Sequence, residues 1–230
     1  GEVAAACRAN GVTVTNFVLN SPDGSINGTL VDPAHRQNYL EALRRAADTA
    51  HSLACRALIT CTGNTRPAVS REEQVSCVVE TLAQAADIAG KEGLTLLLEP
   101  LNTIVDHPGY FLDSSTEGFE IVRRVNSPFL RLLYDIYHMQ IMEGNLSATI
   151  TENISLIGHF HSAGVPGRRE LFNGEINYPF LLRLIEKAGY DGFFGLEYMP
   201  SLPDEESLRK VREYLLGGDP GPASGQPRPG

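Results

Sequence analysis

The sequence predicts an α/β fold, a (β/α)₈ TIM barrel that lacks its first two strands in this chain. Short apolar runs, which indicate buried strands, alternate along the chain with amphipathic segments that indicate helices. Strands that are apolar throughout are typical of a parallel sheet covered by helices on its outer side. Four of the expected strands also end on an acid or a histidine, and barrels of this class carry their chemistry at the C-terminal ends of the strands.

The order of expected elements follows from apolar periodicity and from helix capping residues. One strand is expected over residues 12–19, a second lies within residues 55–62, and four more end at residues 99, 135, 161 and 197. Helices are expected at residues 2–10, from 33 onward, 70–91, 114–124, 148–154, 178–187 and 204–216. Two helix starts match the capping box, Ser70 with Glu73 and Ser114 with Glu117. The N-caps expected for three other helices are Asp32, Asn145 and Asn177.

The four strand ends share one property, because each closes on a side chain that binds metal ions. They are Glu99, Asp135, His161 and Glu197. The intervals between them are 36, 26 and 36 residues, against about 31 residues per unit in a barrel of about 250 residues. A single acid at a strand end is more often a loop cap, and a buried carboxylate is costly unless it is paired, hydrogen-bonded or metal-bound. Four such residues at this period predict one metal site.

The expected domain boundaries are residues 1–216 for the barrel and 217–230 for a disordered tail, which is rich in Gly and Pro and has no apolar periodicity. The chain opens at the end of an expected helix, and the barrel period leaves room for two strands before Gly1. We therefore expect a fragment or an N-terminally shortened form, since an open sheet exposes two edges. A smaller doubly wound sheet is the rival fold, but its Gly-rich nucleotide motif GxGxxG is absent from the sequence.

Composition narrows the classes of partner. With 42% apolar residues, 230 residues are enough for one large core. A net charge of −9 argues against a nucleic-acid groove or an anionic membrane surface, and no apolar stretch approaches the ~20 residues that cross a bilayer. The four cysteines show no CxxC spacing, which favours reduced thiols in a cytoplasmic protein. A small-molecule substrate is the expected partner, and a homo-oligomer is left open.

Five segments together resemble one family of enzymes: LLLEPLN, YDIYHMQIMEGNL, IGHFHSAGVPGR, NGEINYPFL and GLEY. They resemble the hydroxypyruvate isomerase family, a branch of the xylose-isomerase-like barrels that is similar to the ketose 3-epimerases. The resemblance spans residues 12–198 and implies one divalent ion held by Glu99, Asp135, His161 and Glu197. Three carboxylates and one imidazole favour Mn²⁺, Mg²⁺ or Co²⁺ over a structural Zn²⁺. Isomerases of this family often carry Gln where this chain has His161, whereas the epimerases carry His.

The resemblance also implies roles for individual residues. Glu99 and Glu197 are expected to be catalytic, because isomerisation removes a proton beside a carbonyl and returns it to the neighbouring carbon. His138, in the loop expected after Asp135, is expected to contact a substrate oxygen. The other expected substrate-binding residues are Arg168, which is preferred over Arg169 because it follows the Pro-Gly turn, and Asn102, with Tyr137 as a further part of the pocket wall.

Two further residues carry structural expectations. His159 is expected to face the helix layer, on the ground that alternate residues of a strand point to opposite faces. Glu143 is expected either to hydrogen-bond a ligand histidine or to serve as a charge at the start of a helix.

The leading function is a metal-dependent isomerase, of the aldose–ketose type, that interconverts a small hydroxy-oxo acid such as hydroxypyruvate and tartronate semialdehyde. A ketose 3-epimerase of the tagatose 3-epimerase type is the first alternative, since two carboxylates on opposite faces of one carbon would serve it equally. An inactive truncated binding module is the alternative from another class. The DNA-repair endonuclease branch of the same barrels is disfavoured by the acidic charge and by the shortage of further histidines.

Overall fold

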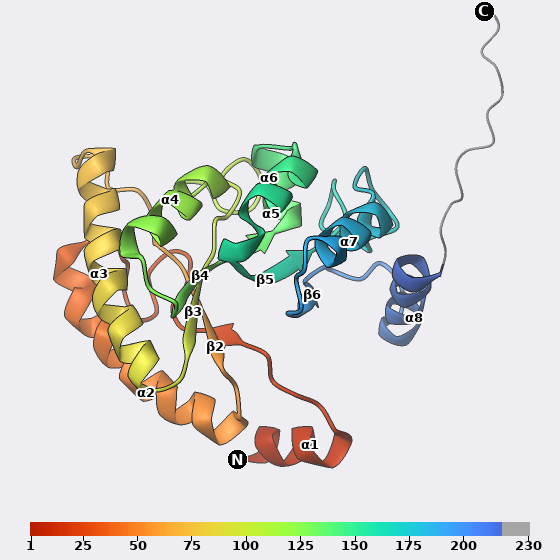
Figure 1. Cartoon of the computed structure of the whole chain (residues 1–230), viewed down its shortest axis with the longest axis horizontal. Coiled ribbons are helices and arrows are strands. Elements are labelled where there is room, and N and C mark those ends of the chain that lie inside the picture. Colours follow the sequence, from red (N-terminus) through yellow and green to blue (C-terminus); the bar gives the residue numbers. More distant parts are fainter. Residues whose placement is uncertain (218–230) are drawn as a thin grey trace, which may run out of the picture.

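A computed structural model of the chain describes residues 1–217, and its centre is one sheet of six parallel strands (Figure 1). Each strand pairs with the next one in the sequence, so the order in the sheet is the order in the chain. The strands are β1 (Phe17–Val18), β2 (Ala57–Thr60), β3 (Thr95–Leu98), β4 (Leu130–Asp135), β5 (Ile157–Ser162) and β6 (Phe194–Leu196). The predicted parallel barrel-type sheet and its chain order are confirmed.

Helices follow the strands and most of them cover the outer side of the sheet, whereas the first helix, at the N-terminus, lies below the sheet against the second (Figure 1). They are α1 (Glu2–Asn10), α2 (Arg36–Leu53), α3 (Arg71–Lys91), α4 (Ser115–Val125), α5 (Ile136–Met142), α6 (Leu146–Asn153), α7 (Tyr178–Lys187) and α8 (Asp204–Leu216). Two single 3₁₀ turns, η1 (Pro33–His35) and η2 (Ile154–Leu156), precede α2 and β5. None of the helices described in residues 1–217 has the length and apolar character needed to cross a membrane.

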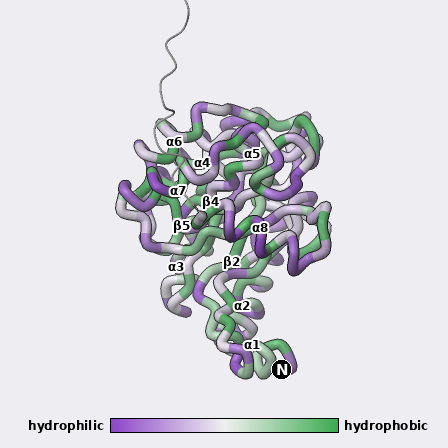
Figure 2. Tube along the Cα trace, turned by 90° about the vertical axis from the view of Figure 1, so that its right-hand side faces the viewer, coloured by the Kyte–Doolittle hydropathy of each residue, from purple (hydrophilic) through white to green (hydrophobic). Residues whose placement is uncertain are grey.

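Alternation along the strands separates two apolar clusters. One face of the sheet packs against the helices, and its strand residues include Leu58, Leu96, Leu98, Leu132 and Phe160. The other face forms a small inner cluster of Ile59, Leu97 and Leu133. Figure 2 shows hydrophobic segments around β2 in the interior, with many of the hydrophilic segments in the surrounding loops. Because side chains two apart share a face, the residues that follow the inner cluster along each strand also point inward.

The predicted helix caps are confirmed in three cases and corrected in two. Ser70 and Glu73 form the full capping box at α3. Asp32 caps the 3₁₀ turn before α2, and Asn177 caps α7 through the backbone N–H of Phe180. The two corrections concern α4 and α6.

At α4, Ser114 accepts from the backbone N–H of Glu117, but no reciprocal bond forms. The Glu117 carboxylate instead pairs at 2.7 Å with Arg71 of α3. The charged Arg71 is a stronger hydrogen-bond donor than the local backbone N–H. At α6, Asn145 occupies the N-cap position with a left-handed φ of 47° and makes no side-chain capping bond. Local capping patterns therefore located both helices but not their contacts.

Two element predictions were wrong. The strand expected over residues 12–19 is a strand only at Phe17 and Val18, which pair with Leu58 and Ile59 of β2. The segment after Asp135, expected to be a loop, is helix α5, whose first backbone N–H groups are capped by the Asp135 carboxylate. The predicted disordered tail at residues 217–230 lies outside the described residues, except for Gly217.

Candidate metal centre

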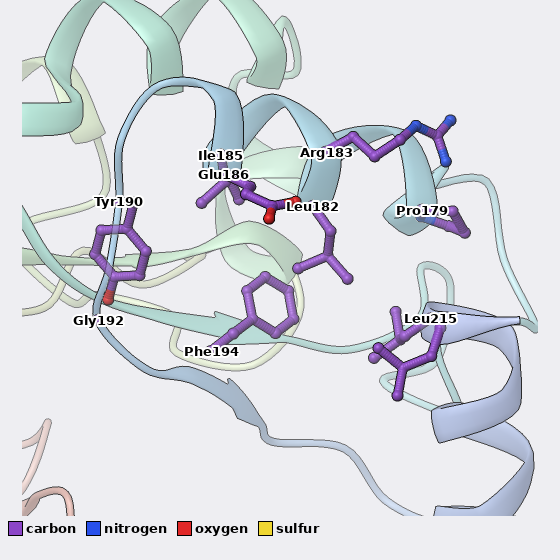
Figure 3. Close-up of a pocket in the computed structure, with 10 residues that line it drawn as sticks. Pro179, Leu182, Arg183, Ile185, Glu186, Tyr190, Gly192, Phe194 and Leu215 are labelled. Carbon is purple, nitrogen blue, oxygen red and sulfur yellow. The ribbon is translucent and has the colours of Figure 1, made fainter. Parts of the chain in front are cut away.

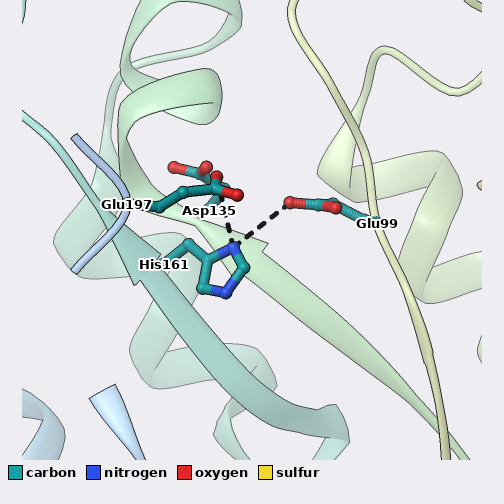
Figure 4. A group of neighbouring side chains, drawn as sticks. All are labelled: Glu99, Asp135, His161 and Glu197. Atoms are coloured by element: carbon teal, nitrogen blue, oxygen red, sulfur yellow. Dashed lines mark ion pairs between the residues drawn. The ribbon is translucent and has the colours of Figure 1, made fainter. Parts of the chain in front are cut away.

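The four predicted ligand residues converge at the C-terminal ends of neighbouring strands. Each offers one ligand atom, and these atoms all lie within 4.8 Å of one another (Figure 4). His161 Nδ1 is 3.5 Å from Glu99 Oε1 and 3.4 Å from Glu197 Oε2. Glu99 and Asp135 stand two residues beyond Leu97 and Leu133 of the inner cluster, so the strand alternation directs both carboxylates inward. The predicted convergence is confirmed.

The donor set fits a divalent cation. Glu99, Asp135 and His161 are buried, whereas the Glu197 side chain is 49% exposed. His161 Nδ1 is buried, faces the centre of the cluster and has no hydrogen-bond partner among residues 1–217. Three carboxylates around one unpartnered imidazole nitrogen leave an excess of negative charge that a hard divalent cation compensates.

The electrostatics of the metal-free cluster follow from burial and mutual charge. Burial, with a further contribution from Glu197, raises the pKa of Asp135 to about 6. Burial opposes protonation of His161, but the nearby carboxylates of Glu197 and Glu99 outweigh it and raise its pKa to about 10. At neutral pH the His161 imidazolium therefore occupies the place that a cation takes.

Asp135 serves both local structure and the cluster. Its Oδ1 accepts from the backbone N–H groups of Tyr137 at 2.8 Å and His138 at 3.3 Å, which starts α5. Its Oδ2 lies 3.5 Å from His138 Nε2. The loop-cap interpretation of this acid and the ligand interpretation are thus compatible, because the two oxygens face different partners.

The predicted substrate-binding residues His138 and Asn102 lie side by side next to the cluster. Both are fully buried, and the Asn102 side-chain amide is 2.6 Å from His138 Nδ1. Burial lowers the pKa of His138 to about 4, although the charge of Glu99 opposes this shift, so the ring is neutral at physiological pH. Asn102 thus lies behind His138 rather than at a free surface of the site.

Arg168, rather than Arg169, reaches the cluster. Its guanidinium donates to Glu197 Oε2 at 2.6 Å and lies over the Tyr137 ring, 5.2 Å from the ring centroid. Arg169 instead donates to the backbone carbonyl of Met199. The Arg168 backbone has a φ of 55°, a left-handed conformation that is unfavourable for a non-glycine residue and that directs this side chain towards Glu197.

Glu170 holds the loop that carries Arg168, and sequence reasoning missed it. Its fully buried carboxylate accepts from Ser201 N and Leu202 N, and from the hydroxyls of Ser201 and Ser207. The loop after β5 is thereby tied to the loop after β6. These donors are distant in sequence, so no local pattern could have indicated them.

We expect Glu170→Gln to lower the free energy of unfolding by about 2 kcal/mol, because the new amide places an N–H group against donors that need an acceptor. Urea denaturation measures the change. Glu186→Gln, on the outer surface of α7, is the matched control. Equal stability of the two variants would contradict the role of Glu170.

The prediction for His159 was wrong. Residues two apart on a strand share a face, so His159 points inward with His161, and their ring centroids are 5.0 Å apart. Phe160, between them, is the residue that packs in the helix-side core. His159 Nε2 lies 3.1 Å from the Asn16 amide.

Gly195 on β6 makes room for both histidines. A Cβ at this position would lie 2.8 Å from His161 Cδ2 and 3.0 Å from His159 Nε2. Overpacking of this kind typically costs about 1–3 kcal/mol.

We expect Gly195→Ala to displace His161 and to weaken Mn²⁺ binding by about 10-fold or more, as measured by calorimetric titration. An unchanged affinity would show that His161 does not need its present position.

Two other side chains differ from expectation or were missed. Glu143 does not bind the ligand histidine His161: it accepts from Ser114 Oγ and from Ser115 N and Oγ, and so anchors the start of α4. Asp106, which no strand pattern indicates, accepts from the Asn102 amide at 2.6 Å and from the Tyr137 hydroxyl at 2.8 Å.

The cavities differ in their relation to the cluster. A groove of about 570 Å³ lies on the helix side, between α7, β6 and α8, and is lined largely by apolar side chains such as Leu182, Tyr190, Phe194 and Leu215 (Figure 3). None of the four cluster residues lines it. A second cavity of about 460 Å³ lies between the loops after β1 and β3 and includes Asp106 and His107. The second cavity is therefore the one that adjoins the buried residues around His138.

Comparisons with known proteins identify the family of the chain. Residues 1–216 match the family model of the xylose isomerase-like TIM barrels, and the chain belongs to that family. A human relative named "Putative hydroxypyruvate isomerase" is 35% identical over 92% of this chain and 79% of its own length. The 2-oxo-tetronate isomerase of Cupriavidus necator is 33% identical over 93% of this chain and 83% of its own length. The predicted resemblance to hydroxypyruvate isomerases is confirmed.

Solved structures give the same fold. A structure from Brucella melitensis titled AP endonuclease, family 2, superposes with a TM-score of 0.85 at 32% identity and covers 92% of this chain and 82% of its own. The IOLI protein with a bound zinc atom has a TM-score of 0.74 at 17% identity, over 94% of this chain and 80% of its own. The second likeness shows the fold alone.

Proposed function

We propose that this protein is a metal-dependent isomerase of a small hydroxy-oxo acid, of the hydroxypyruvate and tartronate semialdehyde type. The observation that carries the proposal is the convergence of two glutamates with Asp135 and His161 around one point. The relatives named as isomerases of hydroxypyruvate and of 2-oxo-tetronate support the same substrate class.

Glu99, Asp135, His161 and Glu197 would hold one divalent ion, and the oxygen-rich set favours Mn²⁺, Mg²⁺ or Co²⁺. When bound, such an ion polarises the substrate carbonyl and stabilises the charge that develops on its oxygen. The charges of His161 and Arg168, with the hydrogen bond from Arg168, hold the pKa of Glu197 near 2 despite its partial burial, so this carboxylate is ionised in the metal-free protein.

The chain's own residues divide the remaining tasks. Glu99 and Glu197 lie on different sides of His161 and can take and return a proton on neighbouring carbons. Arg168 has a planar fork that suits a substrate carboxylate, and it lies within reach because it already binds Glu197. His138 offers its Nε2 to a substrate oxygen.

A ketose 3-epimerase is the second candidate, and His161 is the residue that favours it. Incubation of the Mn²⁺-loaded protein with hydroxypyruvate, with a free ketose and with abasic-site DNA separates the candidates. We expect turnover of hydroxypyruvate. Turnover of the ketose alone would favour the epimerase. Cleavage of the DNA would indicate a nuclease. Mn²⁺ binding without any turnover would indicate a binding module.

A further inference from the structure

The hydrogen bonds of Asn102 fix the orientation of its side-chain amide. Asn102 Oδ1 accepts from the backbone N–H groups of Val105 at 3.0 Å and Asp106 at 2.9 Å. The amide nitrogen is 2.6 Å from Asp106 Oδ2 and 2.6 Å from His138 Nδ1. The reversed amide would set its NH₂ group against two N–H donors and its oxygen against a carboxylate. The NH₂ group therefore faces His138.

This orientation fixes the tautomer of His138. Its Nδ1 meets two donors, the Asn102 amide and the Asn102 backbone N–H at 3.2 Å. Nδ1 must then be the acceptor nitrogen, and the ring proton resides on Nε2. Within residues 1–217, Nε2 is buried and has no hydrogen-bond partner, although it lies 3.5 Å from Asp135 Oδ2 at the cluster. A buried donor without a partner is costly, which points to a ligand atom that completes it.

We infer that Asn102 is a positioning residue that holds His138 as the Nε2–H tautomer, so that this N–H donates to a substrate oxygen beside the cluster. Asn102 itself does not touch the substrate, because the protein takes all of its hydrogen-bonding groups. A neutral, fixed N–H donor stabilises negative charge on that oxygen without reorganisation. The inferred tautomer depends on the structure alone, whereas its use in catalysis rests on the proposed function.

Asp106 completes the arrangement. It accepts from the Asn102 amide and from the Tyr137 hydroxyl, and the Tyr137 ring supports the Arg168 guanidinium. The Asp106 carboxylate thus fixes both Asn102, which contacts His138, and Tyr137, which contacts Arg168. The two side chains proposed to hold the substrate are therefore positioned from one point.

Asn102→Asp tests the inference, and Asp106→Asn is introduced with it in every measurement, because the new oxygen would otherwise lie against the Asp106 carboxylate, which is 2.6 Å from the present amide nitrogen. One oxygen still accepts from the two backbone N–H groups, but the other now presents an acceptor to His138 Nδ1. We expect the ring proton to move to Nδ1, as read from the ¹⁵N chemical shifts of His138 with and without Mg²⁺. The resonances are assigned by their loss in His138→Gln. Asn177→Asp, which adds the same charge at the N-cap of α7, is the matched control and should leave the His138 shifts unchanged.

In kinetics with hydroxypyruvate and Mn²⁺, we expect Asn102→Asp to lower kcat by about 10²-fold, as for the loss of one oxyanion donor. KM and Mn²⁺ affinity should stay unchanged. The double variant with His138→Gln should lose no more than the worse single variant, because both changes remove one donor. If Asn102→Asp does not fold, Asn102→Ala, which keeps only the backbone donor, should show both tautomers.

An Nδ1–H tautomer in the unaltered protein, an unchanged tautomer in Asn102→Asp, or rate losses that multiply in the double variant would each overturn the inference. Failure of the proposed function is distinguishable from these results. A protein inactive on hydroxypyruvate whose His138 carries its proton on Nε2 would refute the substrate and support the positioning role.

Discussion

Glu99→Gln and Glu197→Gln variants are expected to have little activity even at saturating Mn²⁺. Each replacement keeps the size of the side chain and an oxygen for a metal ion, but removes the group that accepts a proton. A positioned acid or base typically contributes about 10²–10⁴-fold in rate. We therefore expect losses of kcat in that range for both variants, with hydroxypyruvate as substrate.

Titration with Mn²⁺ separates the two roles of these glutamates. If they only hold the ion, excess Mn²⁺ should restore most of the activity of either variant. If they also move protons, activity should stay low although the calorimetric titration shows the site filled. Glu186→Gln on the outside of α7 is the matched control. Recovery of near-full turnover by both site variants would refute the two-carboxylate mechanism.

Exchange in D₂O identifies the proton acceptor. Glu197 is half exposed and ionised because His161 and Arg168 lower its pKa, whereas Glu99 is buried. If Glu197 removes the proton, deuterium incorporation into recovered substrate should vanish in Glu197→Gln and persist in Glu99→Gln. The opposite pattern would assign this step to Glu99.

The convergence of the ligands could be predicted because it depends on two rules that operate within a short stretch. Leu97 and Glu99, or Leu133 and Asp135, share a face because strand side chains alternate with a period of two. Parallel strands joined by helices also place their C-terminal ends at one edge. The prediction that His159 faces the helix side misapplied the alternation rule, because His159 and His161 are two residues apart and therefore share a face.

The network behind the cluster could not be predicted, because its partners are far apart in sequence. Asn102 and His138 are 36 residues apart, and Arg71 and Glu117 are 46 residues apart. Glu117 has the sequence position of a capping-box residue, yet it bonds Arg71 of another helix. Local sequence patterns predict the contacts of a residue within its own helix or strand. They do not predict the partners that other helices and strands supply.

The affinity for the metal ion is expected to rise steeply with pH. Ligands must lose their protons before they bind the ion. In the metal-free protein the pKa of His161 is raised to about 10 and that of Asp135 to about 6, so binding at pH 7–8 displaces one proton, from His161. Each displaced proton changes the apparent affinity about tenfold per pH unit. We expect a rise of about tenfold per unit above pH 6 and a steeper one, approaching 100-fold per unit, below it.

Calorimetric titration of Mn²⁺ between pH 5 and pH 8, in buffers of different ionisation enthalpy, measures both the affinity and the protons released. His161→Gln is the decisive variant, because it removes the titrating imidazole and keeps a side-chain oxygen near the cluster. Its affinity should lose the rise of about tenfold per pH unit between pH 7 and pH 8 that comes from His161, although the pKa of Asp135 rises once the His161 charge that lowers it is gone. A flat profile in the unaltered protein would mean that no proton leaves His161. A slope that persists in His161→Gln would assign the displaced proton to another group.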